Sequence, residues 1–131
     1  MNQEVRNWVD MAEMDYGVAE HLFKTYYPKP YEIICYHCQH SAEKIIKAII
    51  LEKGSQGGMP RSHDLSFLMN QIKNQVVIEE KFYDYADELT PYGIAVRYPN
   101  ELFLEERHVK EALKMADEIL KWGKEILLSD E

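Results

Sequence analysis

The side chains best suited to chemistry gather in one short stretch, between Cys35 and Glu43. It contains a Cys-x-x-Cys pair, Cys35 and Cys38, interleaved with a His-x-x-His pair, His37 and His40. A tetrahedral metal site needs four converging ligands, but on one helix these two pairs point to different faces. A thioredoxin-like role would need a βαβ context, which the neighbouring sequence lacks. The stretch therefore predicts two buried thiols and two partly exposed imidazoles, with neither a metal nor a cofactor.

Charged residues near this stretch suggest two ion pairs. Glu43 precedes Lys47 by four residues, which is the favourable order for a helical pair, and taken alone it predicts a solvated surface contact. Asp15 interrupts an apolar stripe in the N-terminal segment. Because a buried carboxylate needs a partner, we expect Asp15 to pair with Lys44, Arg97 or a tyrosine hydroxyl.

A third group is the run Arg97-Tyr98-Pro99. Pro99 restricts Tyr98 to an extended conformation, so Arg97 is expected near a helix end. A guanidinium there suits a phosphate or a carboxylate. The alternative interpretation is that Arg97 caps helix carbonyls or pairs with Asp15 or Glu43.

Helices are predicted to position all of these residues. Breaking residues cluster at 27–30, 54–60 and 97–100, and the apolar spacing between them is helical. We predict helices at about 2–26, 30–54 and 105–128, a shorter one ending near Pro91, and a short one starting near Asp64. Helices of this length with short connections predict an all-α fold: an antiparallel up-and-down helical bundle of four main helices plus one short helix, in a single domain over residues 1–131.

The second predicted helix is unusually apolar at its C-terminal end. Its four isoleucines, Ile45, Ile46, Ile49 and Ile50, cover an arc of about 140°, which exceeds the stripe of a one-sided surface helix. Two interpretations remain open with equal weight. The helix is either central in the bundle or presents a self-association surface.

Composition limits the class of protein. The 131 residues are 46% hydrophobic and carry a net charge of −8, so the overall field does not favour nucleic acid or anionic membranes. No apolar run approaches the roughly 20 residues of a membrane span. The N-terminal residues lack the apolar core of a signal peptide, so the cytoplasm is the expected location.

Several motifs in order along the chain resemble a HEPN domain. They are Trp8, Ala12, Asp15 and Ala19, then Cys38-Gln39, Ala42-Glu43-Lys44, Lys47-Ala48, His63-Asp64-Leu65, Leu68, and finally Arg97-Tyr98-Pro99. The resemblance covers nearly the whole chain. It implies an all-α bundle that commonly dimerises, an association with nucleotide binding, and occurrence beside a minimal nucleotidyltransferase in toxin–antitoxin-like pairs. It also implies that many relatives are metal-independent ribonucleases.

The ribonuclease members of that family carry an arginine followed, after four to six residues, by a histidine. For Arg97 the histidine would have to be residue 102, 103 or 104, which are Leu102, Phe103 and Leu104. His108 lies too far along. The resemblance therefore supports the fold and Arg97 as a pocket residue, but it does not support nuclease chemistry. The acidic net charge also argues against tight RNA binding.

The leading hypothesis is a binding module that forms a homodimer and accepts a nucleotide, another phosphate-bearing ligand or a nucleotidyltransferase partner. Arg97 would contact the anion, and Tyr92 and Tyr98 would stack on a base or line the pocket. The pocket wall would include Asp15, Glu43 and Lys44.

Two alternatives belong to other functional classes. One is a ribonuclease toxin with a degenerate motif, using Arg97 and either His108 or His63. The other is a purely structural homodimer that scaffolds a nucleotidyltransferase.

Overall fold

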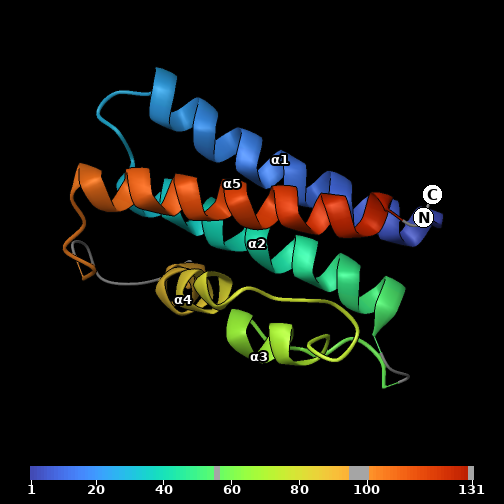
Figure 1. Ribbon diagram of the computed structural model, residues 1–131. Helices are drawn as coiled ribbons and strands as arrows, with labels where there is room; N and C mark the ends of the chain where they lie inside the picture. Colours follow the sequence, from blue (N-terminus) through green and yellow to red (C-terminus); the bar gives the residue numbers. More distant parts are fainter. Residues whose placement is uncertain (55–56, 95–100, 130–131) are drawn as a thin grey trace.

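Helices make up the framework of the protein. The computed structural model describes residues 1–54, 57–94 and 101–129. The elements are α1 (Gln3–Thr25), α2 (Tyr31–Lys53), α3 (Leu65–Asn70), α4 (Glu80–Leu89), the 3-10 helix η1 (Thr90–Gly93) and α5 (Glu106–Leu128) (Figure 1). Within these ranges there is no strand, and the predicted bundle of four main helices and one short helix is confirmed.

Capping side chains explain why the helices begin where they do. The Asn2 side chain accepts a hydrogen bond from the Val5 amide at the start of α1, and Asp64 caps α3 in the same way. At the start of α5, Glu105 and His108 form a reciprocal capping box, in which the Glu105 amide donates to His108 Nδ1 at 2.9 Å. His108 is therefore part of a helix end.

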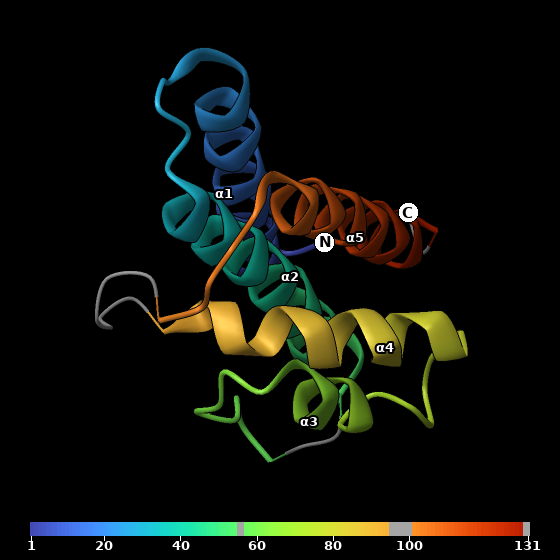
Figure 2. The ribbon, with the colours of Figure 1, turned by 90° about the vertical axis from the view of Figure 1, so that its left-hand side faces the viewer.

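The long helices lie side by side, with α1 antiparallel to α2 (Figure 1). The segment that contains α3 and α4 packs on the far side of α2 and returns the chain to the end where α2 begins. As a result, α5 runs antiparallel to α1, and it ends at the same end of the bundle where α1 begins. The view in Figure 2 shows that α4 crosses the bundle instead of following its long axis.

Helix α2 is the centre of the bundle and contacts all the other helices. Ile45, Ile46 and Ile49 are fully buried and Ile50 is 7% exposed. This favours the first of the two interpretations left open by the sequence: the wide apolar arc of α2 is covered by the other helices of the same chain, as expected for a central helix. Gly123 of α5 lies against Ile45, where a Cβ atom would collide with that side chain. In the described ranges, no helix has the length and apolarity needed to cross a membrane.

Candidate functional site

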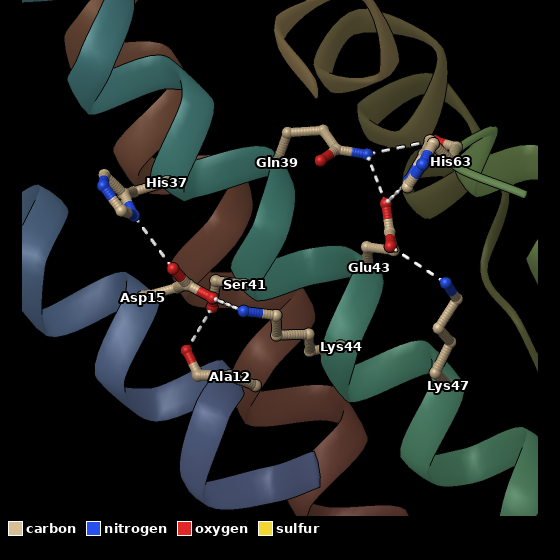
Figure 3. A network of polar contacts seen from close by, with 9 residues as sticks. All are labelled: Ala12, Asp15, His37, Gln39, Ser41, Glu43, Lys44, Lys47 and His63. Carbon is tan, nitrogen blue, oxygen red and sulfur yellow. Dashed lines mark hydrogen bonds and ion pairs between the residues drawn. The ribbon is translucent and has the colours of Figure 1, made fainter. Parts of the chain in front are cut away.

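A row of polar and aromatic side chains follows one side of α2, where it borders α1 on one flank and the α3–η1 region on the other. We call this row the α2 polar strip; its members are Tyr36, His37, Gln39, His40, Glu43, Lys44 and Lys47. The residues are spaced by three, four or seven positions, which brings them to neighbouring turns of the same helix face. Figure 3 shows most of the strip together with its partners from the other elements.

Asp15 of α1 contacts two side chains in the N-terminal half of the strip. Its Oδ1 atom lies 2.8 Å from His37 Nδ1, and its Oδ2 atom accepts a hydrogen bond from Lys44 Nζ at 2.5 Å. The side chains of Asp15, His37 and Lys44 are 12%, 25% and 20% exposed, so the group is partly shielded but reachable from solvent. The predicted partner Lys44 is confirmed, whereas the sequence did not identify His37 as the second partner.

A hydrogen bond between uncharged groups joins α1 and α2 one helical turn away from Asp15. The buried Ser41 hydroxyl donates to the Ala12 carbonyl at 2.7 Å. Since Ala12 precedes Asp15 by one helical turn, this bond sets the rotation of α1 that directs the Asp15 carboxylate at α2 (Figure 3).

Glu43 organises the second half of the strip. Its Oε1 atom accepts from Gln39 Nε2 at 3.2 Å and lies 2.8 Å from His63 Nδ1, and its Oε2 atom accepts from Lys47 Nζ at 3.0 Å. The prediction of a solvated Glu43–Lys47 pair is wrong, since these residues are only 4% and 8% exposed. The reason is that both flanks of α2 are covered; on the α1 side, the Lys47 ammonium lies 5.9 Å from the centre of the Trp8 ring.

The charge state of Glu43 follows from this arrangement. Burial by itself raises the pKa of the carboxyl group, but the hydrogen bonds from His63, Lys47 and Gln39 outweigh burial and lower the pKa below its ordinary value. Glu43 is therefore a carboxylate at neutral pH. It holds His63, whose side chain is 72% exposed, at the edge of the strip.

His40 connects the two halves. Its ring packs against Tyr36 in a tilted arrangement, with centroids 4.1 Å apart and an interplanar angle of 39°, and lies 6.4 Å from the ring of His63. Burial lowers the pKa of His40, so the ring is neutral at pH 7. Within the described part of the chain, two buried side-chain atoms of the strip have no hydrogen-bond partner: His40 Nε2 and Gln39 Oε1.

A depression of about 270 Å³ opens at the N-terminal end of the strip. It is lined by Glu32, Ile33, Tyr36, His37 and Ile94. The lining combines two aliphatic side chains, one aromatic face and one carboxylate with the imidazole that also contacts Asp15. Such a mixture suits a flat ring with polar edges.

The six residues predicted for the site do not all meet. Asp15 and Lys44 form one ion pair, whereas Glu43 belongs to the second network. Tyr92 lies in η1, where burial raises its pKa to about 12. Arg97 and Tyr98 lie outside the described residues.

His37, His40 and Gly93 belong to this region but were not assigned to a binding site from the sequence, and His63 was named only for the ribonuclease alternative. His37 precedes Lys44 by two helical turns, and that spacing was a usable signal that both reach the same partner. His40 and His63 gave no comparable signal. Gly93 matters because a Cβ atom there would approach the Gln39 Cδ atom to 2.6 Å. Nowhere in the described ranges do three histidine, cysteine or acidic side chains converge on a possible metal position.

Comparison with protein families assigns the fold. The model of the HEPN domain matches residues 5–127. The chain belongs to the HEPN domain family. No curated protein sequence matches the chain at a significant level.

Solved structures share the HEPN fold over almost their whole length. TT1696 from Thermus thermophilus is 23% identical with a TM-score of 0.78, and the match covers 95% of this chain and 98% of that one. ST0689, described as an archaeal HEPN homologue, is 26% identical with a TM-score of 0.69 and coverages of 95% and 97%. A HEPN domain protein from Thermotoga maritima is 21% identical with a TM-score of 0.71 and coverages of 92% and 97%.

Proposed function

We propose that this HEPN domain binds a nucleotide, or a related ligand that carries phosphate, at the α2 polar strip, and that it does so as the partner of a nucleotidyltransferase. The observation that carries the proposal is that His37, which lines the Tyr36 depression, belongs to the Asp15–His37–Lys44 group. An aromatic wall beside two basic side chains supplies the two kinds of contact that a nucleotide needs.

In this proposal the base occupies the depression. The Tyr36 face and the Ile33 and Ile94 side chains provide apolar contact, and the Glu32 carboxylate accepts a hydrogen bond from an amine on the base. Tyr36 is well suited to this role because its close contact with the His40 ring restrains the tyrosine before a ligand arrives.

The phosphates would extend along the strip to His37 and Lys44. Asp15 already holds both of these side chains, so they meet the ligand in a fixed position at little further entropic cost. Arg97, on the segment that follows η1, would add a bidentate contact to a phosphate, and Tyr98 a further aromatic face. A nucleoside triphosphate is also the substrate class of a nucleotidyltransferase, which is why the two parts of the proposal belong together.

A thermal-unfolding screen tests the ligand. Purified protein is titrated with the four ribonucleoside triphosphates and with inorganic triphosphate. A ligand at about 100 times its dissociation constant stabilises the fold by about 2.7 kcal/mol, which corresponds to several degrees in Tm. We expect Lys44→Met and Arg97→Ala to lose most of the ligand-induced shift.

The matched control is Lys110→Met, which removes a lysine that is 62% exposed on α5 and pairs with Glu106. It should keep the full shift. If no nucleotide raises Tm, or if Lys44→Met and Arg97→Ala shift as much as Lys110→Met, the ligand assignment is wrong. The nucleotidyltransferase partner is tested separately, by identifying the proteins that co-purify with the untagged protein from its own host.

One observation favours a second candidate, the degenerate ribonuclease. Glu43 holds His63 through Nδ1, and the His63 side chain is 72% exposed, so its ring combines a carboxylate partner with access to solvent, as a histidine that accepts or donates a proton requires. His108 is occupied in the α5 cap and does not fit this role. The test is cleavage of single-stranded RNA by purified protein without metal. Cleavage that His63→Ala abolishes and His108→Ala preserves supports this candidate, and the absence of cleavage rejects it.

A further inference from the structure

Helix α3 lies at the edge of the molecule opposite α1, where it packs on α2 and α4 (Figures 1 and 2). Two depressions border it, with volumes of about 490 and 240 Å³. The larger one is lined by Pro60, Arg61, Ser62, Asp64 and Phe67. The lining of the smaller one includes Ile50, Pro60 and Gln71. Because Pro60 belongs to both, and Phe67 and Gln71 are one helical turn apart, the two depressions adjoin, and we call them together the α3 groove.

Arg61 is the cation of this groove, and its exposed side chain has no partner within the chain. Among the lysines and arginines of residues 1–54, 57–94 and 101–129, only Arg61 and Lys73 take part in no ion pair, hydrogen bond or ring contact. The neighbouring Asp64 carboxylate does not pair with Arg61, since it accepts a hydrogen bond from the Phe67 amide at 3.2 Å. The Arg61 guanidinium is therefore available to a carboxylate from outside the chain.

The charge around α3 is opposite to that of the protein as a whole. Residues 53–78 contain Lys53, Arg61 and Lys73 but a single acidic residue, Asp64, so this segment has a net charge of +2. The whole chain has a net charge of −8. An acidic ligand is therefore attracted to the α3 groove, while most of the remaining surface repels it.

The groove also offers apolar contact. Phe67 is 46% exposed, and Pro60 lies beside it in the lining. The stretch of α3 from Asp64 to Gln71 is about 10 Å long at 1.5 Å per residue, which matches three or four residues of an extended peptide. In an extended peptide, side chains two positions apart point to the same side, so one can reach Arg61 while the next reaches Phe67.

We propose that the α3 groove binds a short acidic segment of a partner protein in an extended conformation. An aspartate or glutamate of the segment pairs with the Arg61 guanidinium, and an aliphatic side chain two positions away packs on Phe67 and Pro60. The occupant is a peptide and not a nucleic acid, because one guanidinium and one aromatic ring do not supply the series of phosphate and base contacts that a strand needs. The inference does not depend on the proposed nucleotide, since none of its evidence comes from the α2 polar strip.

A selection from a phage library of random hexapeptides on the immobilised full-length protein tests the occupant. We expect the selected peptides to be enriched in aspartate and glutamate, with leucine, isoleucine or valine two positions away. The protein's net charge of −8 by itself favours basic peptides, so acidic enrichment requires a local site. A basic or uncharged consensus, or no consensus, overturns the proposal.

Substitutions then locate the site. The most frequent peptide is labelled with a fluorophore, and its dissociation constant is measured by anisotropy. Arg61→Ala and Phe67→Ser should each raise that constant about ten-fold. The matched controls are Arg107→Ala, at a side chain 68% exposed, and Phe103→Ser, at a residue 80% exposed, and both should bind as the wild type does.

The same assay distinguishes a nucleic acid from a peptide. Unlabelled peptide should displace the labelled one, whereas hexauridylate at the same concentration should not. Equal affinities of Arg61→Ala and Arg107→Ala overturn the assignment of the groove. Displacement by hexauridylate as effective as that by the peptide overturns the choice of occupant.

Discussion

We expect the substitution Glu43→Gln to destabilise the fold strongly. Glu43 is 4% exposed and bonds three side chains at once, of which the most costly to abandon is the Lys47 ammonium, 8% exposed and 3.0 Å away. Glutamine keeps the size and one acceptor oxygen of the side chain but removes the charge. The ammonium then remains in a buried position without a counter-ion.

The size of the effect follows from that unpaired charge. Removing one member of a buried ion pair costs about 3–5 kcal/mol, and the oxygen that glutamine retains places this case near 3 kcal/mol. For a chain of this length the corresponding loss in Tm is roughly 10 °C. The second change Lys47→Met removes the stranded charge, so Glu43→Gln/Lys47→Met should recover most of the lost stability.

The effect should also depend on pH. The folded-state pKa of Glu43 lies below its ordinary value. The stabilisation it provides is therefore complete above the ordinary carboxyl pKa of about 4.3 and is lost as the pH falls through the lower, folded-state value. The difference in unfolding free energy between wild type and Glu43→Gln should be constant near pH 7 and decrease with acidification below about pH 4.

Urea unfolding followed by circular dichroism, at several pH values, measures both quantities. Glu118→Gln is the matched control, because Glu118 also bonds a lysine, Lys81 at 3.1 Å, but in a solvated position where the loss should stay below about 1 kcal/mol. If Glu43→Gln costs no more than Glu118→Gln, or if adding Lys47→Met deepens the loss, then Glu43 is not the buried centre of this network.

Two other predictions concern tight packing around α2. Gly93→Ala forces Gln39, which is fully buried and held by two hydrogen bonds, to move, and we expect a loss of about 1–3 kcal/mol in urea unfolding. Gly17→Ala is its control and should be neutral or stabilising by up to about 1 kcal/mol, because the added methyl meets nothing; equal losses would contradict the close approach at Gly93. Burial raises the pKa of Cys35 to about 12 and raises that of Cys38 strongly, so neither thiol should react with a disulfide reagent at pH 8 until the protein is denatured. Rapid modification of the folded protein would show that the core at α2 opens.

The helices could be predicted closely from the sequence because local signals determine them. The predicted helix at about 2–26 is observed at Gln3–Thr25, and the one at about 30–54 is observed at Tyr31–Lys53, with Gly54 at its C-terminal cap as expected. Caps, breakers and apolar spacing all act within a few residues, so one sequence contains the whole of that information.

The site was harder to predict because its contacts depend on how the helices pack. Asp15 had several possible partners, and only the rotation of α1 on α2 selects Lys44 and His37 together. For Glu43 the sequence predicted an exposed ion pair with Lys47. The pair is buried because other helices cover α2 on both flanks, and this covering is a property of the tertiary fold. The same holds for the isoleucine arc, whose width fitted a central helix and a docking surface equally well.

Imidazole proton NMR tests the proposed function most directly, because the chain has five histidines and three of them surround the proposed ligand. His37 and His40 are members of the α2 polar strip and His63 bonds to it, whereas His21 is exposed near the end of α1 and His108 belongs to the α5 cap. On titration with the nucleotide that raises Tm most, we expect saturable shifts of the His37 and His40 resonances, a smaller shift for His63, and unchanged signals for His21 and His108. Shifts confined to His21 or His108, or no shifts at all, would contradict binding at the strip.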